Sequence, residues 1–558
     1  MKTFSNDTVA SRLILNDSPK NSEKSSMDDV DVLIIGAGAS AAAFAWSLAD
    51  TRMHIVCLEQ GDWVDHRNYP SVGKDWQNRP DFGSDPNLRK APADYPINCE
   101  DSDISVANYN GVGGGTILYA AHFPRFHPSD FKVRTLDGVA DDWPIDYATL
   151  EPFYAVNDRM MGVSGLAGDP AYPPKQPPMP PLPLGKSSST LARGFNKLGW
   201  HWWPTDCAIN TEPYEGRDKC INLGTCGIGC PQGAKASVDV TYWPLAIRAG
   251  VEMRANCRVR EITVGSDGMA TGAIYYDADG TEQQINASMV VVACNGIGTP
   301  RLLLNSVSTL FPDGLANSSG LVGKNLMFHP YGGVDGVFDD EQDGNKGPHK
   351  GISCHEFYET DTSRGFTRGF SFEMHRGYGP ISSALLGMVT GRIPWGDAHH
   401  KAYREIVDRT VTLVTVCEDL PETHNEVVLD AEMCDSNGMP AAKVNYRMGE
   451  NSKKILRFAL DRAREAVQAA GANEILREVG PVAGAGWHNM GTARMGKDPS
   501  SSVVNEWGRS HDVKNLFIID GSLFVTCAAI NPTPTIQALA LYVASAVKGR
   551  LADGTLFD

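Results

Sequence analysis

Three closely spaced cysteines are the first residues in the chain that could do chemistry. Cys220, Cys226 and Cys230 follow the pattern C-x5-C-x3-C, and a proline comes directly after the third. Three thiolates can bind a three-iron cluster, and Gly227 and Gly229 leave room and backbone N–H groups for the cluster sulfides. Zinc is less favoured, because a closed zinc site needs four ligands. A disulfide, or three inert thiols, are the open alternatives.

Residues 30–59 indicate a bound dinucleotide cofactor. An iron–sulfur cluster would have a function only if such a cofactor supplied electrons to it. VDVLII predicts a buried strand, GAGASA a glycine-rich turn, AAAFAWSLA a helix and HIVCLE a second buried strand. In a dinucleotide fold Gly36 makes the tight turn, Gly38 lets the backbone approach a pyrophosphate, and Ala41 permits close helix packing. Glu59 can accept a ribose hydroxyl. The alternative is a glycine-rich turn in some other α/β protein.

A second glycine-rich segment, residues 112–131, helps to choose between NAD and FAD. VGGGTILYAAHFPRFHPSDF has too much glycine for the interior of a helix or strand, but it suits a backbone that lies against a ligand. We therefore expect Gly113, Gly114 and Thr116 to contact the cofactor, and the second cluster favours FAD. A flexible surface loop is the alternative interpretation.

Charge and composition exclude several other functions. The 558-residue chain has a formal net charge of −17, which argues against binding nucleic acid or an anionic membrane surface. No apolar run reaches the ~20 residues that span a bilayer. Residues 1–27 are rich in Ser, Asn, Asp and Lys and carry no export signal. They predict a disordered tail and a cytoplasmic protein.

Towards the C-terminus the chain resembles the glucose-methanol-choline (GMC) family of FAD-dependent oxidoreductases, and among its subgroups the bacterial sugar dehydrogenases. The segments that carry the resemblance stand in the family's order and include DWPIDYATLEPFY (142–154), VVACNGIGTPRLLLNS (291–306), LVGKNLMFHP (321–330), AGWHNMGTARMG (485–496), NLFIIDGSLFVT (515–526) and INPTPTIQALAL (530–541). The resemblance implies an α/β fold with a Rossmann-type FAD-binding domain and a sheet-containing substrate-binding domain over the flavin.

The resemblance also implies a discontinuous division of the chain. The FAD-binding domain takes 28–135, 251–320 and 485–558. The substrate-binding domain takes 136–250 and 321–484, including the cysteine-rich segment 220–235.

Further cofactor contacts come from this resemblance and from one strand. NLFIID predicts a buried strand that ends at Asp520 and Gly521, where α/β sheets bind their ligands. The acid suits the ribityl or ribose hydroxyls. In relatives, Val259 lies in a backbone segment beside the adenine and Asn295 lies near the same end of the cofactor. The resemblance adds Thr533 to the cofactor-binding residues.

The resemblance assigns catalysis to His488 and Asn531. Oxidation of an alcohol by hydride transfer needs a base for the hydroxyl proton, and a neutral imidazole suits that role near pH 7. Asn531 would hold the substrate oxygen as donor or acceptor. The competing interpretation of His488 is a satisfied core histidine. Asn489 is the sequence neighbour, and on a strand it would point the other way.

One departure from the family concerns the link to the flavin. In some relatives a histidine within the segment GGGTILYAA is bound covalently to the cofactor, and Leu118 stands there in this chain. We therefore expect non-covalent FAD. His122 lies four residues later and would need a shifted loop to form the link.

Three function classes follow from the sequence. The first is an FAD-dependent dehydrogenase of a sugar, glycoside or polyol, which passes electrons through a 3Fe-4S cluster to a cytochrome-type acceptor. The second is an oxidase or dehydrogenase of an apolar alcohol, and the third is a non-catalytic flavin-binding subunit. The resemblance adds a candidate small subunit. If that subunit bore the export signal, the protein would be periplasmic by co-export.

Overall fold

A mixed sheet, whose β5-β2-β1-β8-β16 part is parallel, forms the first layer of the structure. The computed structural model describes residues 30–69, 92–344, 346–376 and 378–557, so the predicted disordered tail lies outside the described residues. Within this part, seven strands form one sheet in the order β5-β2-β1-β8-β7-β6, with β16 also paired to β8. Their bounds are β1 Val30–Ile35, β2 Ile55–Leu58, β5 Glu252–Arg254, β6 Arg258–Val264, β7 Ala270–Tyr276, β8 Glu282–Val292 and β16 Leu516–Ile518.

Strand β8 joins two halves of this sheet. Its second half pairs in parallel with β1 and β16, and its first half pairs antiparallel with β7. The strands β1 and β2 are buried along almost their whole length, as apolar strands of a sheet covered on both faces should be. The predicted α/β, Rossmann-type fold is confirmed.

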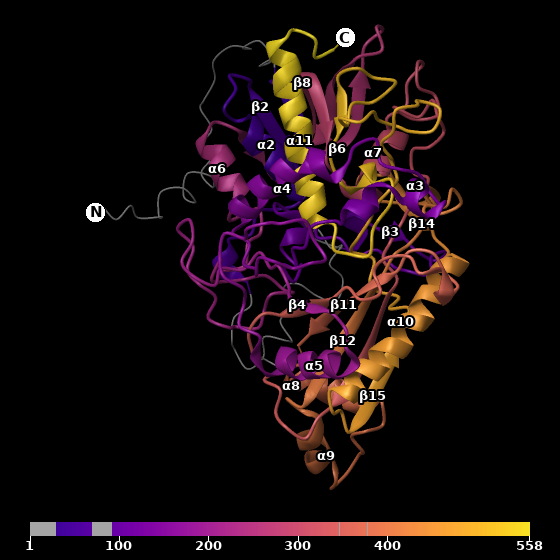
Figure 1. Ribbon diagram of the computed structural model, residues 1–558. Coiled ribbons are helices and arrows are strands. Elements are labelled where there is room, and N and C mark those ends of the chain that lie inside the picture. The colour runs from indigo at the N-terminus through magenta and orange to yellow at the C-terminus, as the bar shows by residue number, and fades with distance from the viewer. Residues whose placement is uncertain (1–29, 70–91, 345, 377, 558) are drawn as a thin grey trace.

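Helices cover the parallel sheet. Helix α11 (Thr533–Ala552) packs against α2 (Ala39–Leu48) and α4 (Tyr147–Met161), and α2 also contacts α6 (Tyr242–Arg248). Figure 1 shows α2, α11 and β8 together in the upper part of the molecule. Two of these helices, α4 and α6, come from the range 136–250.

An antiparallel sheet forms the second part. Its order is β15-β9-β12-β11-β10-β4. The bounds are β4 Trp202–Pro204, β9 Tyr331–Val337, β10 Ile352–Cys354, β11 Phe370–His375, β12 Thr410–Cys417 and β15 Glu474–Val479. Helix α10 (Glu450–Ala469) packs on β9 and β12 and on α5 (Gly185–Leu198). These elements lie in the lower part of the molecule (Figure 1).

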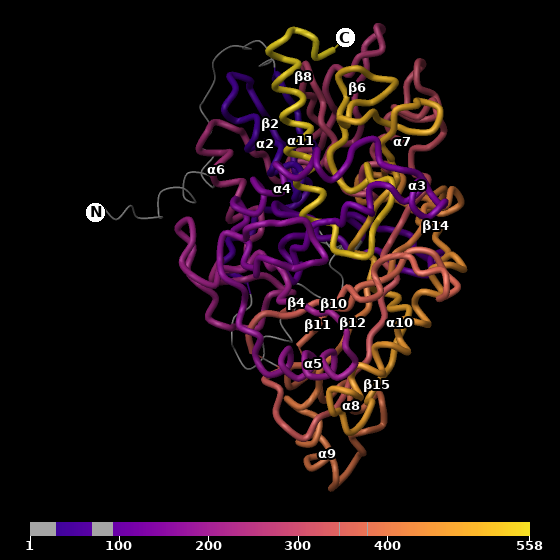
Figure 2. Tube along the Cα trace, in the orientation of Figure 1, coloured from indigo at the N-terminus to yellow at the C-terminus, as the bar shows by residue number. Residues whose placement is uncertain are grey.

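Smaller elements complete the chain. A three-stranded sheet joins β13 (Glu426–Cys434), β14 (Pro440–Asn445) and β3 (Ile97–Asn98), and α7 (Asn295–Asn305) packs on β13 and β14. The remaining helices are α3 (Val133–Asp137), α8 (Pro380–Val389) and α9 (His399–Ile406). The tube in Figure 2 shows the chain leaving the upper part, building the lower part in orange and returning to the upper part in yellow.

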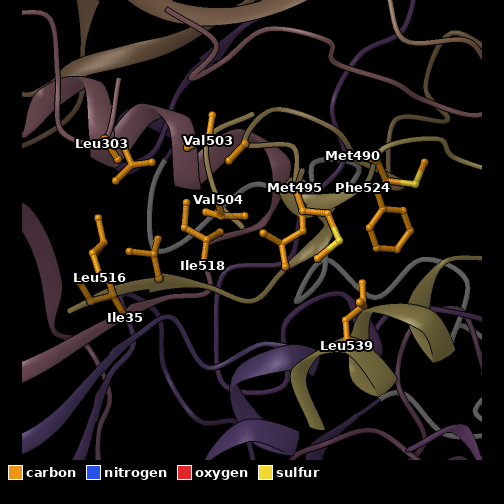
Figure 3. Close-up of a cluster of buried hydrophobic side chains, with 14 of the residues drawn as sticks. Ile35, Leu303, Met490, Met495, Val503, Val504, Leu516, Ile518, Phe524 and Leu539 are labelled. Carbon is orange, nitrogen blue, oxygen red and sulfur yellow. The ribbon is translucent and has the colours of Figure 1, made fainter. Parts of the chain in front are cut away.

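The returning segment is anchored by an apolar core. Met490 and Met495 lie with Phe524 from the segment after β16 and Leu539 from α11 in one cluster of buried side chains (Figure 3). Each is at most 2% exposed, and burying such a side chain contributes roughly 1.5–3 kcal/mol. This core holds the loop around residue 488 and the loop before α11 in fixed positions.

Candidate active site

One elongated pocket runs along the carboxyl ends of the parallel strands, where an open α/β sheet binds its ligand. The predicted cofactor residues that line it are Gly36, Gly38, Glu59, Gly114, Thr116, Val259, Asn295, Asp520, Gly521 and Thr533, together with His488. Within the described residues the lining does not include Ala41, Gly113 or Asn531.

The first glycine turn fits a dinucleotide. Gly36 has φ +94°, and a Cβ there would lie 2.6 Å from the carbonyl oxygen of Ala293. A Cβ on Gly38 would meet no atom within 4 Å, so its face is open towards the pocket. Ala41 is fully buried on α2, as close packing requires. The Glu59 carboxylate accepts hydrogen bonds from Ala37 N (2.8 Å) and Gly61 N (2.9 Å), which fixes this strand end.

The second glycine segment lies against the first. A Cβ on Gly114 would stand 2.9 Å from the Cα of Gly38, so the two backbones touch. Gly113 has φ +106° and makes the turn, while its carbonyl accepts a 2.6 Å hydrogen bond from the Thr116 hydroxyl. The two glycine-rich segments, which are far apart in the sequence, therefore meet in the pocket.

Asp520 organises the middle of the pocket. Its buried carboxylate accepts hydrogen bonds from Ser522 N (2.9 Å), Asn295 N (3.0 Å) and Thr299 Oγ1 (2.6 Å). Burial raises the pKa of this carboxyl. Asp520 thus joins the end of β16 to the start of α7, a role beyond the predicted contact with sugar hydroxyls. The pocket is thus bordered by the turns at Gly36 and Gly114 and by the Asp520 turn. At Gly36 and Gly114 another backbone segment lies close by, and this arrangement fits an extended dinucleotide.

His488 lies at the other end of the pocket and contacts a second histidine. The Nδ1 atoms of His488 and His329 are 2.8 Å apart. His329 Nε2 lies 3.2 Å and 3.0 Å from the carbonyl oxygens of Cys527 and Ala528. Carbonyls only accept, so His329 Nε2 carries the proton, and burial lowers the pKa of His329 to about 4.

These contacts fix the tautomer of His488. A neutral His329 that donates from Nε2 has a bare Nδ1, so His488 Nδ1 donates to it. Burial, with His329 beside it, holds the pKa of His488 well below its ordinary value, so this ring is neutral too. The lone pair of His488 therefore resides on Nε2. A neutral imidazole with that lone pair, on a residue that lines the pocket, can accept a proton.

Asn531 and Tyr331 stand beside His488. The Tyr331 hydroxyl lies 3.4 Å from His488 Nδ1 and hydrogen-bonds the Asn531 side chain. Asn531 Oδ1 lies 2.6 Å from Nδ1 of the buried His122. Trp487, 48% exposed, packs edge-on against Tyr331 at a ring distance of 5.3 Å. Two polar side chains thus lie next to His488, and Trp487, which lines the pocket, packs against one of them.

Two expectations about neighbouring residues need comment. Residues 484–491 form no strand, and Asn489 lines the same pocket as His488, so the expectation that it points away is wrong. Its Nδ2 donates to Asn108 Oδ1 at 3.3 Å and to Gly486 O at 3.2 Å. His122, which would need a shifted loop to form the covalent link, contacts Asn531 and Thr205 with its ring nitrogens.

The cysteine-rich segment 220–235, called the cysteine loop below, lies against the second glycine-rich segment, residues 112–131. The buried Lys235 ammonium donates to the carbonyls of Ile117 (2.7 Å), Tyr119 (3.0 Å) and Cys226 (2.7 Å). Burial lowers the pKa of Lys235 to about 8. One side chain therefore ties the loop to the backbone that carries Thr116 and Leu118.

The three cysteines form no ligand set for a single metal ion among the described residues. Among the described residues, no three His, Cys, Asp or Glu side chains are grouped so that they could hold a metal ion. Burial raises the pKa of Cys226, and it raises that of Cys220 to about 11. Arg376 lies near both, and two of its nitrogens, Nε and Nη1, have no hydrogen-bond partner in the described part of the chain. The three-iron cluster at these thiols therefore stays a prediction from their spacing.

The sequence did not identify the residues that contact His488 and Asn531 from behind. His329 stands in the segment LVGKNLMFHP, and Glu373 and His375 stand in the strand FSFEMH. Charged residues in an otherwise apolar strand were the available signal, because a buried charge needs a partner. Nothing local tells which partner it finds.

Comparisons with known proteins agree with this geometry. Family models described as GMC oxidoreductase match residues 183–331 and 421–540. The chain is 41% identical to 2-methyl-1,2-propanediol dehydrogenase of Mycolicibacterium austroafricanum, over 95% of this chain and 97% of that protein. It is 30% identical to the fructose dehydrogenase large subunit of Gluconobacter japonicus, over 94% and 98%.

A solved structure adds evidence for the fold. The crystal structure of pyridoxine 4-oxidase from Mesorbium loti matches with a TM-score of 0.65 at 16% identity, over 93% of this chain and 99% of that one. In the part of the chain that the structure describes, we find no helix with both the length and the apolar character needed to cross a bilayer.

Proposed function

The chain belongs to the GMC oxidoreductase family, and we propose that it is a dehydrogenase that oxidises a hydroxyl of a sugar, glycoside or polyol. That it is an FAD-dependent oxidoreductase of the alcohol-oxidising kind follows from the family and from relatives that match almost their whole length. The observation that carries the finer proposal is the neutral His488, whose Nε2 lone pair belongs to a residue lining the pocket.

We assign the chemical roles as follows. When bound, FAD supplies the acceptor for the hydride that leaves the substrate carbon. His488 Nε2 takes the hydroxyl proton, since its Nδ1 proton is engaged with His329. Asn531 donates to the substrate oxygen and so limits its rotation. Trp487 and Tyr331 exclude water from one side.

FAD is held non-covalently in this proposal. The glycine turns at Gly36 and Gly114, with Glu59 and Asp520, supply the cradle. Leu118 cannot form a link, and His122 is engaged at both ring nitrogens. Acid precipitation should release the flavin into the supernatant, whereas flavin in the pellet would contradict a non-covalent site.

The substrate class is tested by anaerobic flavin reduction. Purified holoenzyme is mixed with 2-methyl-1,2-propanediol, glycerol, fructose, glucose, benzyl alcohol and a long-chain alcohol, and bleaching of the flavin band is followed. The 41% identical diol dehydrogenase supports a small polyhydroxy substrate. Bleaching by the aromatic or long-chain alcohol alone would instead support the apolar-alcohol class.

The electron acceptor is a separate proposal. We propose a dehydrogenase with a non-oxygen acceptor, supported by the two relatives that are named dehydrogenases. One of them is a large subunit, which supports an additional small subunit here. Reoxidation of the reduced flavin by oxygen at the rate of turnover would overturn the assignment.

The cluster at Cys220, Cys226 and Cys230 is proposed on sequence spacing alone, and we route no electron through it. Iron and sulfide analysis after anaerobic purification, with electron paramagnetic resonance, tests it. About three irons per chain would support a three-iron cluster. Iron-free protein with full activity would leave three thiols.

A further inference from the structure

A buried polar cluster lies directly behind Asn531, and the catalytic roles above do not use it. We call it the His122 cluster; its members are His122, Thr205, Lys350, Glu373 and His375. His122, Lys350 and Glu373 are 3%, 4% and 1% exposed. His122 comes from the second glycine-rich segment, Lys350 from the residues before β10, and Glu373 from β11. Tertiary structure alone therefore brings them together.

The contacts of His122 fix which of its nitrogens carries a proton. Its Nδ1 lies 2.6 Å from Asn531 Oδ1 and 2.9 Å from Glu373 Oε1. Burial alone would raise the pKa of Glu373, but the contacting Lys350 ammonium and His122 hold that pKa well below its ordinary value. Glu373 is thus an acceptor only. A ring nitrogen beside a carboxylate must carry a proton.

The proton on His122 Nδ1 in turn fixes the amide of Asn531. With Oδ1 facing His122, the amide accepts that proton, and its NH2 group points away from the cluster. The reversed amide would set two donors against each other in a buried place, which proteins avoid. The Tyr331 hydroxyl also hydrogen-bonds the Asn531 side chain. A hydroxyl oxygen can accept, so this contact is compatible with the Asn531 NH2 group as the donor.

We propose that His122 is a positioning residue that makes Asn531 a hydrogen-bond donor towards the substrate oxygen, with Glu373 and Lys350 holding His122 in that state. The proposal rests on the proposed function, because it assigns Asn531 to the reacting hydroxyl. A free asparagine could present either its oxygen or its NH2 group. The cluster removes that choice before substrate binds, which is preorganisation in the ordinary sense.

Two substitutions of His122 separate positioning from packing. In His122→Asn the amide nitrogen takes about the place of Nδ1 and can still donate to Asn531. In His122→Gln the amide nitrogen takes about the place of Nε2, so that contact is lost. We expect anaerobic flavin reduction to fall about 10-fold in His122→Gln and His122→Ala, and to stay within ~3-fold in His122→Asn.

A double-mutant cycle tests whether His122 acts through Asn531. If it does, adding His122→Ala to Asn531→Ala should change the flavin reduction rate by less than ~2-fold. The substrate is 2-methyl-1,2-propanediol or the alcohol from the panel above that reduces the flavin fastest. Flavin content and thermal midpoint are measured for every variant, and His127→Gln, a buried histidine outside the cluster, is the matched control.

The outcomes distinguish the two proposals. Equal losses in His122→Asn and His122→Gln, or a full further loss in the Asn531→Ala background, would overturn the positioning role while leaving Asn531 catalytic. Wild-type flavin reduction in Asn531→Ala would overturn the role of Asn531 in the proposed function, and the inference with it. If His122→Ala does not fold, the comparison of His122→Asn with His122→Gln still decides the question.

Discussion

The end of the pocket near His488 and the cysteine loop differ in how many of their polar side chains find hydrogen-bond partners within the protein. At the end near His488 the side chains with proposed roles are paired: His488 meets His329, and Asn531 meets His122. Among the described residues, Asn489 Oδ1 at this end has no hydrogen-bond partner. Beside the cysteine loop, Arg376 keeps two nitrogens without a hydrogen-bond partner among the described residues, and those residues include no group of three His, Cys, Asp or Glu side chains that could hold a single metal ion. The first region is preorganised by the polypeptide. The second is not preorganised by hydrogen bonds in the same way, so substitutions in the two regions should have different effects.

The largest effect should follow from removing the base. In His488→Ala we expect flavin reduction by substrate to fall ~10²-fold or more, the usual scale for a lost general base. FAD content should stay near that of the wild type, because the glycine turns and Asp520 remain. Stopped-flow reduction and the flavin-to-protein absorbance ratio measure both. Near-normal reduction would mean that the catalytic end of the pocket lacks the role we give it.

Removing the backing histidine should have the next largest effect. His329→Ala takes away the acceptor that fixes the tautomer of His488, so both tautomers become populated and the Nε2 base is present only part of the time. We expect the rate of flavin reduction to fall about 10-fold. This loss is smaller than the ~10²-fold loss expected when the base itself is removed. His329→Asn can place its side-chain oxygen at about the position of Nδ1, so it can still accept from His488 and should lose less. An equal loss in both variants would indicate a packing role.

The pH dependence of flavin reduction should be shifted towards acid. The base form of His488 predominates above its pKa, and that pKa lies well below the ordinary value for histidine. The rate should therefore stay constant as the pH falls from 8 through ~6.5, where an ordinary histidine would be half protonated. It should decline only at lower pH. A half-maximal rate near pH 6.5 would show that the site does not depress this pKa.

Part of this comparison could be predicted from the sequence and part could not. Strands β1 and β2, the glycine turn at Gly36 and the end of β16 at Asp520 are local patterns, and local patterns survive folding. His488 and Asn531 were assigned through the family. His329 and His122 act only because β9, β11 and the returning segment around Met490 converge, and no spacing along the chain records that convergence. The cysteines show the reverse case, since their spacing is a clear local pattern while the cluster that it predicts stays a prediction.

The cysteine loop should be sensitive to backbone changes independently of its thiols. Gly229 has φ +98°, and a Cβ there would lie 2.4 Å from Cγ of Tyr69. Gly229→Ala should therefore lower the free energy of unfolding by roughly 1–3 kcal/mol. Gly227→Ala is the matched control, because its Cβ would meet its nearest neighbours at 3.9 and 4.0 Å. Thermal melts should separate the two variants, and equal melting points would show that the loop adapts.

The smallest effect should come from Cys226→Ser in the reductive half-reaction. The thiol makes none of the contacts that position His488 or Asn531, and Lys235 holds the loop through the backbone carbonyl of Cys226. Flavin reduction by substrate should therefore change less than ~2-fold, within the range expected for a site that is energetically independent. Turnover with a one-electron acceptor is the second measurement. If turnover falls while flavin reduction stays constant, the loop serves the oxidative half-reaction; if neither changes, it is structural. A fall in flavin reduction itself would show that the two regions are coupled, because the chain would then need its cysteine loop to organise the catalytic end of the pocket.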